Sequence, residues 1–319
     1  MKKFMFSMMA CIILLSSNAC SDSNMNPTAH PDLKESGEIT VKDFGKTIPV
    51  GIDKENDTFR VSLMIRAQPF KIKDTKENTV FISMIRQAIR DKFPLHIFIK
   101  AGTPEIVRVE KVTEEDLRYF KSALSERAKK ETINTLSRVI PNVNLLNSLF
   151  AQIKNLSCET SPASPCITFR YPIDGCYARA HKMREILNQA GYECEKQFVY
   201  GNLKASTGTC CVAWAFHVAI LVSFKNASGV IEKRIIDPSL FSNGPVPDAV
   251  WRDACVNSLC GSSSVSSFVN TAGDVYYRDP TGSLFLYDDH LISTNCTLNT
   301  YYPLSGCNTY VLNECPVFN

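Results

Sequence analysis

Cysteine is distributed very unevenly along this chain. Of the 13 cysteines among 319 residues, only Cys11 and Cys20 precede Leu136, and the rest follow it. Disulfides stabilise domains in oxidising compartments, so the split predicts a cysteine-free front part and a disulfide-stapled back part. The odd number in the back part favours ten paired cysteines and one free thiol, for which Cys176 is the candidate. The alternative is that all of them are structural and one pairs with another chain.

The N-terminus has the pattern of an export signal. Two lysines open the chain, an apolar run follows at residues 4–15, and small residues at 17–19 suit cleavage. We therefore expect residues 1–20 to be a signal peptide and the protein to be secreted. Cys20 directly follows the expected cleavage site, so transient lipid anchoring there and ordinary signal-peptide removal both stay open. No later stretch is long and apolar enough for a membrane span.

Residues 21–135 are interpreted as a small α+β pro-region. After a polar leader, apolar periodicity predicts strands at 59–65 and 95–99 and helices at 78–93 and from Thr113, as N-cap, to near Lys130. A polar junction follows at 129–135, and proteolysis concentrates in exposed segments of this kind. The expected division is thus a pro-region at 21–135 and a catalytic domain at 136–319. The alternative is two ordinary domains that stay linked.

Cys176 is the first candidate catalytic residue. Turn signals at Pro172 and Asp174-Gly175 precede it, and apolar residues at helical spacing follow it up to Gly191. The pattern predicts a helix that begins at Cys176. A helix N-terminus favours a thiolate and offers N–H groups to an oxyanion, as a nucleophilic cysteine requires. The structural alternative is a disulfide half-cystine.

His217 and Asp237 complete a candidate triad. Residues 211–224 form a long apolar strand with His217 in its middle, and a second strand at 230–237 follows a turn. A hairpin closed directly between these strands puts His217 opposite Asp237, with Cβ atoms about 5 Å apart. Cys176 would then attack, His217 would transfer the proton, and Asp237 would orient the imidazole. A lone histidine in an apolar strand is, however, more often a core residue.

Other residues give weaker signals. His181 lies on the helix of Cys176 and is expected to face solvent, and His290 sits in an acidic turn. The sequence has no zinc, calcium or phosphate-loop motif, so we expect no metal and no cofactor. The net charge of +3 gives no reason to expect nucleic acid as a partner.

The same residues carry a family resemblance. Residues 136–318 closely resemble the bacterial secreted protein-glutaminases, which are protein-deamidating enzymes, and the similarity extends through the pro-region. The matching stretches are CITFRYP (166–172), DGCYARAHKMR (174–184), CEKQFVYGNL (194–203), CCVAW (210–214), HVAILV (217–222) and RIIDPSLF (234–241).

The resemblance implies a fold, a reaction and a precursor. The implied fold is the transglutaminase core, a cysteine-protease-like α+β arrangement, with Cys176, His217 and Asp237 as the catalytic residues. The implied reaction hydrolyses the side-chain amide of exposed glutamine in proteins and peptides to glutamate and ammonia, through a thioester. The implied form is a monomeric, latent zymogen inhibited by its own pro-region, which is removed near Thr135-Leu136.

Three other readings stay open. The same triad would serve a transglutaminase-like acyltransferase or a cysteine protease, and a disulfide-stapled binding module would need no free thiol. The resemblance also suggests that the pro-region mimics a substrate. Gln68, which ends the strand-like run 59–67, is the residue expected to imitate the substrate glutamine, with the alternative that it merely terminates the strand.

Overall fold

The structure is a computed structural model that describes residues 33–35, 39–127, 137–160 and 164–315. The expected signal peptide, Cys20 and the junction 129–135 lie outside these ranges. None of the helices in the described ranges is long and apolar enough to cross a membrane.

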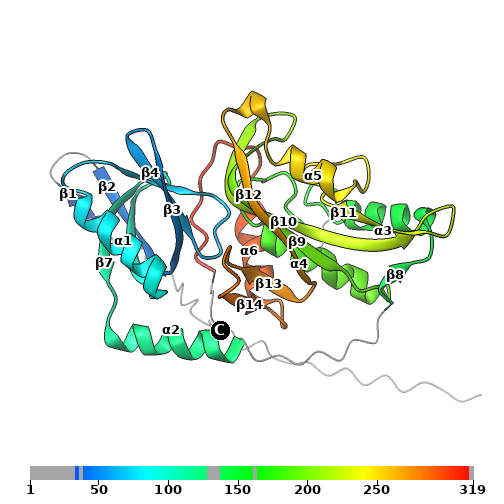
Figure 1. The fold of residues 1–319 in the computed structure, drawn as a ribbon, viewed down its shortest axis with the longest axis horizontal. Helices are drawn as coiled ribbons and strands as arrows, with labels where there is room; N and C mark the ends of the chain where they lie inside the picture. The colour runs from blue at the N-terminus through cyan, green and yellow to red at the C-terminus, as the bar shows by residue number, and fades with distance from the viewer. Residues whose placement is uncertain (1–32, 36–38, 128–136, 161–163, 316–319) are drawn as a thin grey trace, which may run out of the picture. The chain divides into compact units, whose positions relative to one another are not determined.

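The front part is built from antiparallel sheets and two helices (Figure 1). One sheet has the order β1-β2-β6-β7 and the other the order β3-β4-β5. The elements are β1 (Leu33–Glu35), β2 (Ile39–Thr47), β3 (Pro49–Glu55), β4 (Thr58–Leu63), β5 (Phe70–Lys73), α1 (Thr79–Asp91), β6 (Leu95–Lys100), β7 (Ile106–Lys111) and α2 (Glu114–Arg127). The Thr113 hydroxyl accepts a hydrogen bond from the Asp116 N–H at 3.1 Å, which confirms it as the cap of α2.

The back part centres on one sheet of order β11-β10-β9-β12, with β8 pairing parallel to β10. Its strands are β8 (Val139–Ile140), β9 (Glu195–Ser206), β10 (Cys211–Lys225), β11 (Ile231–Ile236) and β12 (Ser264–Ala272), and a separate pair joins β13 (Val275–Arg278) to β14 (Phe285–Tyr287). Its helices are α3 (Val143–Asn155), α4 (Cys176–Gln189), α5 (Asp248–Ala254), the short η1 (Ser258–Cys260) and α6 (Ile292–Tyr301). The mixed helix-and-sheet class predicted from the sequence is confirmed.

Two hydrophobic cores follow the division of the chain. The front core gathers residues of β4, β5, β6 and α1, such as Val61 and Ile85. The second core belongs to the back part, yet five front-part residues are buried in it: Ile48, Met64, Ile65, Ala67 and Phe120. The front part is therefore bound to the back part by shared apolar burial, which stabilises contacts by about 25 cal/mol per Å².

Cysteine pairing differs from the prediction. The described residues form four disulfides rather than five: Cys158–Cys166, Cys210–Cys307, Cys211–Cys260 and Cys296–Cys315. Cys176, Cys194 and Cys255 are free and buried. The prediction rested on the odd number of cysteines in the back part. A buried free cysteine packs as a small apolar residue, and the number of cysteines does not reveal that role.

The helix that begins at Cys176 is buried on almost every side. Arg179 and His181 are buried in α4, so the expectation that His181 faces solvent is wrong. The His181 Nε2 bonds to the Asp288 carbonyl at 3.1 Å, and because a carbonyl only accepts, this nitrogen carries the proton. The Lys196 ammonium then donates to the Nδ1 of His181 at 2.8 Å and to the Val275 carbonyl at 2.7 Å.

We predict a pH-dependent stability that originates at Lys196. Burial lowers the pKa of Lys196 to about 7, so the unfolded chain binds more protons than the folded one above that pH. The free energy of unfolding therefore rises with pH above about 7, by at most about 1.4 kcal/mol per pH unit from this group. Denaturant unfolding at pH 7 and pH 8 measures this rise in the free energy of unfolding, and the Lys196→Met variant should lack the part that Lys196 contributes. The exposed Lys225→Met variant is the control and should keep it, whereas equal slopes in all three proteins would contradict the prediction.

Candidate active site

Cys176 is the first residue of α4, as the turn signals before it indicated. Gly175 caps the helix at φ 79°, and a Cβ there would lie 2.9 Å from the Tyr301 ring. Both the positive φ and the close packing require glycine. Gly175 has no side chain and so makes no capping hydrogen bond to the N–H groups of the first turn, which are the groups that can bind an anion at a helix start.

His217 and Asp237 form a buried pair. The His217 Nε2 lies 2.7 Å from the Asp237 Oδ2, and the two residues are 1% and 3% exposed. The same oxygen accepts a hydrogen bond from the Trp251 Nε1 at 2.9 Å, and Oδ1 accepts one from the Ser239 N–H at 3.1 Å. Because the carboxylate only accepts, the Nε2 of His217 carries the proton.

The electrostatics of this pair keep Asp237 charged. Burial raises the pKa of Asp237, but the charge and hydrogen bond of His217 and the hydrogen bond from Trp251 outweigh that effect, so the net pKa is lowered. An ionised Asp237 accepts the hydrogen bond from His217 Nε2 and holds the imidazole in one orientation.

The hairpin register that led to this pair is wrong by two residues. Ile220 pairs with Ile236, so a continued ladder would place Asp237 opposite Ala219, but β11 ends before it does. A shift of two residues keeps side chains on the same face, whereas a shift of one would have reversed them. The predicted contact between His217 and Asp237 is therefore present as a diagonal one, made where the chain leaves the sheet.

The remaining nitrogen of His217, Nδ1, lies on the side of the ring away from Asp237. Nδ1 is buried and has no hydrogen-bond partner among the described residues. The sulfur of Cys176 accepts a hydrogen bond from the main-chain N–H of Val218, the residue next to His217. Trp214 stacks on the imidazole at 4.2 Å between ring centroids, with 7° between the planes. Its indole is fully buried, so Trp214 fixes the ring of His217 by packing.

The Cys176 thiol is protonated in this form of the protein. Burial raises its pKa to about 12, and the nearby charge of Arg179 and the hydrogen bond from Val218 lower it too little to compensate. The expectation that the helix N-terminus favours a thiolate is thus not met while Cys176 is only 2% exposed. Desolvation outweighs the helix dipole here.

A front-part segment lies between the two halves of the site. The Ala67 N–H donates to the Asp174 Oδ1 at 3.0 Å, and the Ala67 carbonyl accepts from the Ala215 N–H at 2.7 Å. Asp174 precedes Cys176 by two residues and Ala215 precedes His217 by two. Ala67 is fully buried whereas Gln68 is only partly buried, so the residue at the site is Ala67 and not the expected Gln68.

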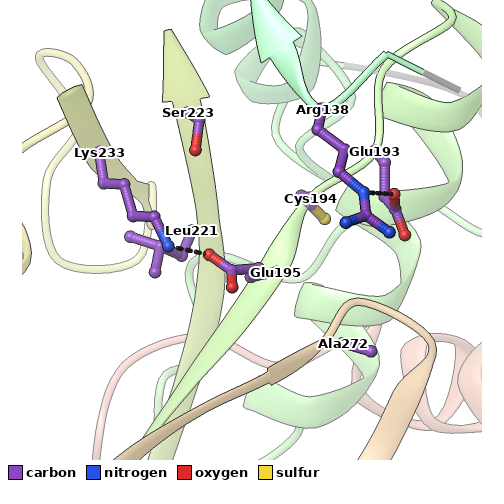
Figure 2. Close-up of a pocket in the computed structure, with 8 residues that line it drawn as sticks. All are labelled: Arg138, Glu193, Cys194, Glu195, Leu221, Ser223, Lys233 and Ala272. Atoms are coloured by element: carbon purple, nitrogen blue, oxygen red, sulfur yellow. Dashed lines mark hydrogen bonds and ion pairs between the residues drawn. The ribbon is translucent and has the colours of Figure 1, made fainter. Parts of the chain in front are cut away.

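Other candidates lie apart from this arrangement. His290 is exposed, and the described residues contain no group of three or more potential metal ligands. A cavity of about 370 Å³ lies beside the start of β9 and contains none of the triad (Figure 2). Its walls carry two ion pairs, Arg138 with Glu193 and Lys233 with Glu195, and the buried Cys194.

Sequence reasoning missed two residues of the site. Trp251 lies 14 residues beyond Asp237, and no periodicity connects the two. Asp174 was explained by its turn alone, yet its carboxylate binds Ala67 and accepts a hydrogen bond from the Tyr301 hydroxyl at 2.9 Å. A buried carboxylate needs such donors, but only the tertiary fold shows that Asp174 is buried.

Comparison with protein-family models relates the chain to the glutaminases. A family model described as glutaminase matches residues 146–255, which contain Cys176, His217 and Asp237. A search of curated proteins found no significant match.

The solved structures that resemble this chain are those of protein-glutaminase and its precursor. A crystal structure of pro-protein-glutaminase is 62% identical, covers 86% of this chain and 99% of that chain, and gives a TM-score of 0.82. A crystal structure of protein-glutaminase is 68% identical over 57% of this chain and 100% of that chain, with a TM-score of 0.55. The NMR structure of protein-glutaminase from Chryseobacterium proteolyticum is 69% identical with the same coverage and a TM-score of 0.53. The chain belongs to the protein-glutaminase family, with the pro-region of its precursor form bound to the catalytic domain.

We predict that Cys176 reacts slowly with alkylating agents in the full-length protein. A thiol with a pKa of about 12 contains little thiolate at neutral pH, and the sulfur is covered. Alkylation by iodoacetamide, followed by peptide mass analysis, should rise at least tenfold (about one pKa unit) once the pro-region is removed. Equal rates before and after removal would contradict the prediction.

Proposed function

We propose that this protein is a secreted protein-glutamine glutaminase, made as a latent zymogen, that hydrolyses the side-chain amide of glutamine in proteins and peptides. The observation that carries the proposal is the buried His217–Asp237 pair beside the Cys176 sulfur at a helix N-terminus. Identity of 62% to pro-protein-glutaminase supports the substrate assignment.

The proposed chemistry uses three side chains. His217 takes the thiol proton at Nδ1 as the Cys176 sulfur attacks the amide carbon, and the first-turn N–H groups of α4 stabilise the oxyanion. The C–N bond breaks, ammonia leaves with the proton from His217, and a thioester remains. His217 then deprotonates a water that attacks the thioester, which releases glutamate and restores the thiol. Asp237 stabilises the imidazolium in both steps.

We propose that latency results from occupation of the site by the pro-region. Ala67 is held by the Asp174 carboxylate and the Ala215 N–H, one on each side of the site. A substrate glutamine whose main chain took the same two hydrogen bonds would be held between the segments that carry Cys176 and His217. The pro-region thus excludes substrate and keeps the thiol desolvated.

The proposed processing follows the sequence division. Residues 1–20 are removed as the signal peptide, 21–135 as the pro-region, and 136–319 remain as the enzyme. Four disulfides in the described back part support an oxidising, extracellular location. The protein-glutaminase structures that correspond to 57% of this chain support a catalytic domain of this size.

The function is tested by ammonia release from a glutamine-rich protein, with the chain matured by removal of its pro-region. We expect release without cleavage of the substrate chain, and loss of at least 10³-fold in Cys176→Ala, because attack on the amide needs the thiol. The matched control is Cys255→Ser, which alters another buried free cysteine and should retain measurable activity.

The same assay separates the alternatives. Incorporation of an added primary amine in place of ammonia loss to water would favour an acyltransferase, and new substrate termini would favour a protease. A folded, matured protein that produces none of these changes would contradict the proposed enzyme.

The role of Ala67 in latency gives a separate prediction. Ala67 is fully buried, so Ala67→Leu forces extra carbons into the site and should loosen the pro-region, at a cost of about 1–3 kcal/mol. We expect the uncleaved Ala67→Leu precursor to release ammonia faster than the wild type. The partly exposed Gln68→Ala variant is the control and should stay latent. Equal latency of both variants, with gels confirming intact chains, would contradict the assignment of Ala67.

A further inference from the structure

A second pro-region side chain penetrates the catalytic domain, at a place that the triad does not use. Arg60 of β4 is only 7% exposed. Its Nη2 donates to the Gly201 carbonyl at 3.0 Å, and its Nη1 donates to the Asn202 Oδ1 at 3.2 Å and the Trp214 carbonyl at 3.3 Å. Its ion pair with the pro-region's own Asp53 is longer, at 3.5 Å. Three oxygens of the catalytic domain thus converge on one guanidinium.

The acceptors are available because the sheet is irregular at this point. Between β9 and β10 the register shifts so that Gly201 and Asn202 lie across from the single residue Ala215. Between β12 and β9 it shifts again beside Gly201, which leaves Ser266 as an extra residue. Figure 1 shows β9 lying between β10 and β12. Bulges of this kind take main-chain groups out of the ladder and re-aim them.

Glycine at position 201 is required by this arrangement. Its φ is 154°, and a Cβ there would lie 2.1 Å from the main-chain oxygen of Ser264. A side chain at this position would therefore displace β12 and the carbonyl that Arg60 binds. A cavity of about 220 Å³ adjoins the guanidinium, lined in part by Tyr200, Phe216 and Ser267.

The three oxygens are contiguous with the proposed substrate site. The Trp214 carbonyl belongs to the peptide group whose N–H, on Ala215, binds Ala67. One peptide unit therefore binds Ala67 with its N–H and the Arg60 guanidinium with its carbonyl. Because all three acceptors belong to the catalytic domain, they remain when the pro-region leaves.

We propose that the Gly201 carbonyl, the Trp214 carbonyl and the Asn202 Oδ1 form a guanidinium subsite in the matured enzyme, which takes an arginine side chain of the protein substrate. The inference rests on the proposed function, since it assigns a preference to the same active site. Arginine fits better than lysine because its planar fork presents several N–H donors in fixed directions. In the precursor Arg60 occupies the place of that substrate arginine.

The test uses the matured enzyme and peptides with one central glutamine. A single arginine is moved through the flanking positions on both sides, out to at least seven positions from the glutamine, which is the offset of Arg60 from Ala67. Each peptide has a twin in which neutral citrulline replaces the arginine. The measured quantity is the ratio of kcat/KM for ammonia release from the arginine and citrulline twins. We expect a ratio of about ten at the position that reaches the subsite, the size of effect that a charge-assisted hydrogen bond provides.

Two variants of Asn202 test whether the arginine-to-citrulline ratio originates at this subsite. Asn202→Asp keeps an acceptor and adds a negative charge, so the ratio should rise, whereas Asn202→Leu removes the acceptor and should lower it. Asn155→Asp adds the same charge at an exposed residue of α3 and should leave the ratio unchanged. The subsite would be overturned if the ratio were near one at every position, or if the Asn202 variants left the ratio unchanged. Ammonia release from the citrulline peptides would, in that case, still support the glutaminase. Absence of release from all peptides would overturn both proposals.

Discussion

The candidate active site depends on the burial of one carboxylate. Asp237 is almost inaccessible to solvent, and an isolated charge in such a place would cost several kcal/mol. Its oxygens are matched by His217, by the indole of Trp251 and by the Ser239 N–H. Each donor comes from a different place in the back part: β10, α5 and the segment that follows Asp237. The sheet and α5 must therefore be assembled before the imidazole acquires its fixed tautomer.

The bulge between β9 and β10 would connect the proposed catalysis with the proposed latency. A regular ladder would use the Ala215 N–H and the Trp214 carbonyl for pairing, whereas here they face the pro-region. The pro-region is held through these main-chain groups and through apolar residues such as Met64 and Ile65 in the catalytic core. Inhibition and substrate recognition would thus use one irregular stretch of sheet, and a mutation that regularised it would weaken both.

Local patterns in the sequence predicted much of the site. Turn residues followed by helical spacing placed Cys176 at the start of α4, and the apolar run of β10 placed His217 inside the sheet. The hairpin was predicted two residues out of register because the turn closes between Asn226 and Val230, a detail that turn composition does not fix.

What the sequence could not give are contacts between segments far apart in the chain. His181 is buried because Lys196 and Asp288 meet it from other elements, and no pattern within α4 encodes that. Trp251 reaches Asp237 from α5, and Cys194 and Cys255 form no disulfide within the described residues. Parity, periodicity and spacing are local signals, and they do not report tertiary burial.

The short strand β8 bears on whether cleavage at the junction would by itself release the pro-region. Residues just after the junction are fixed to the catalytic domain, with Val139 paired to Ser223 and Ser137 bridged to Tyr192. The pro-region is fixed to the same domain by Arg60 and Ala67, which do not depend on the junction. Cutting the junction would therefore turn the bound pro-region from a tethered ligand into a separate one, with the contacts of Arg60 and Ala67 still in place. Activity of a nicked precursor would then follow mass action and increase on dilution or with digestion of the released fragment.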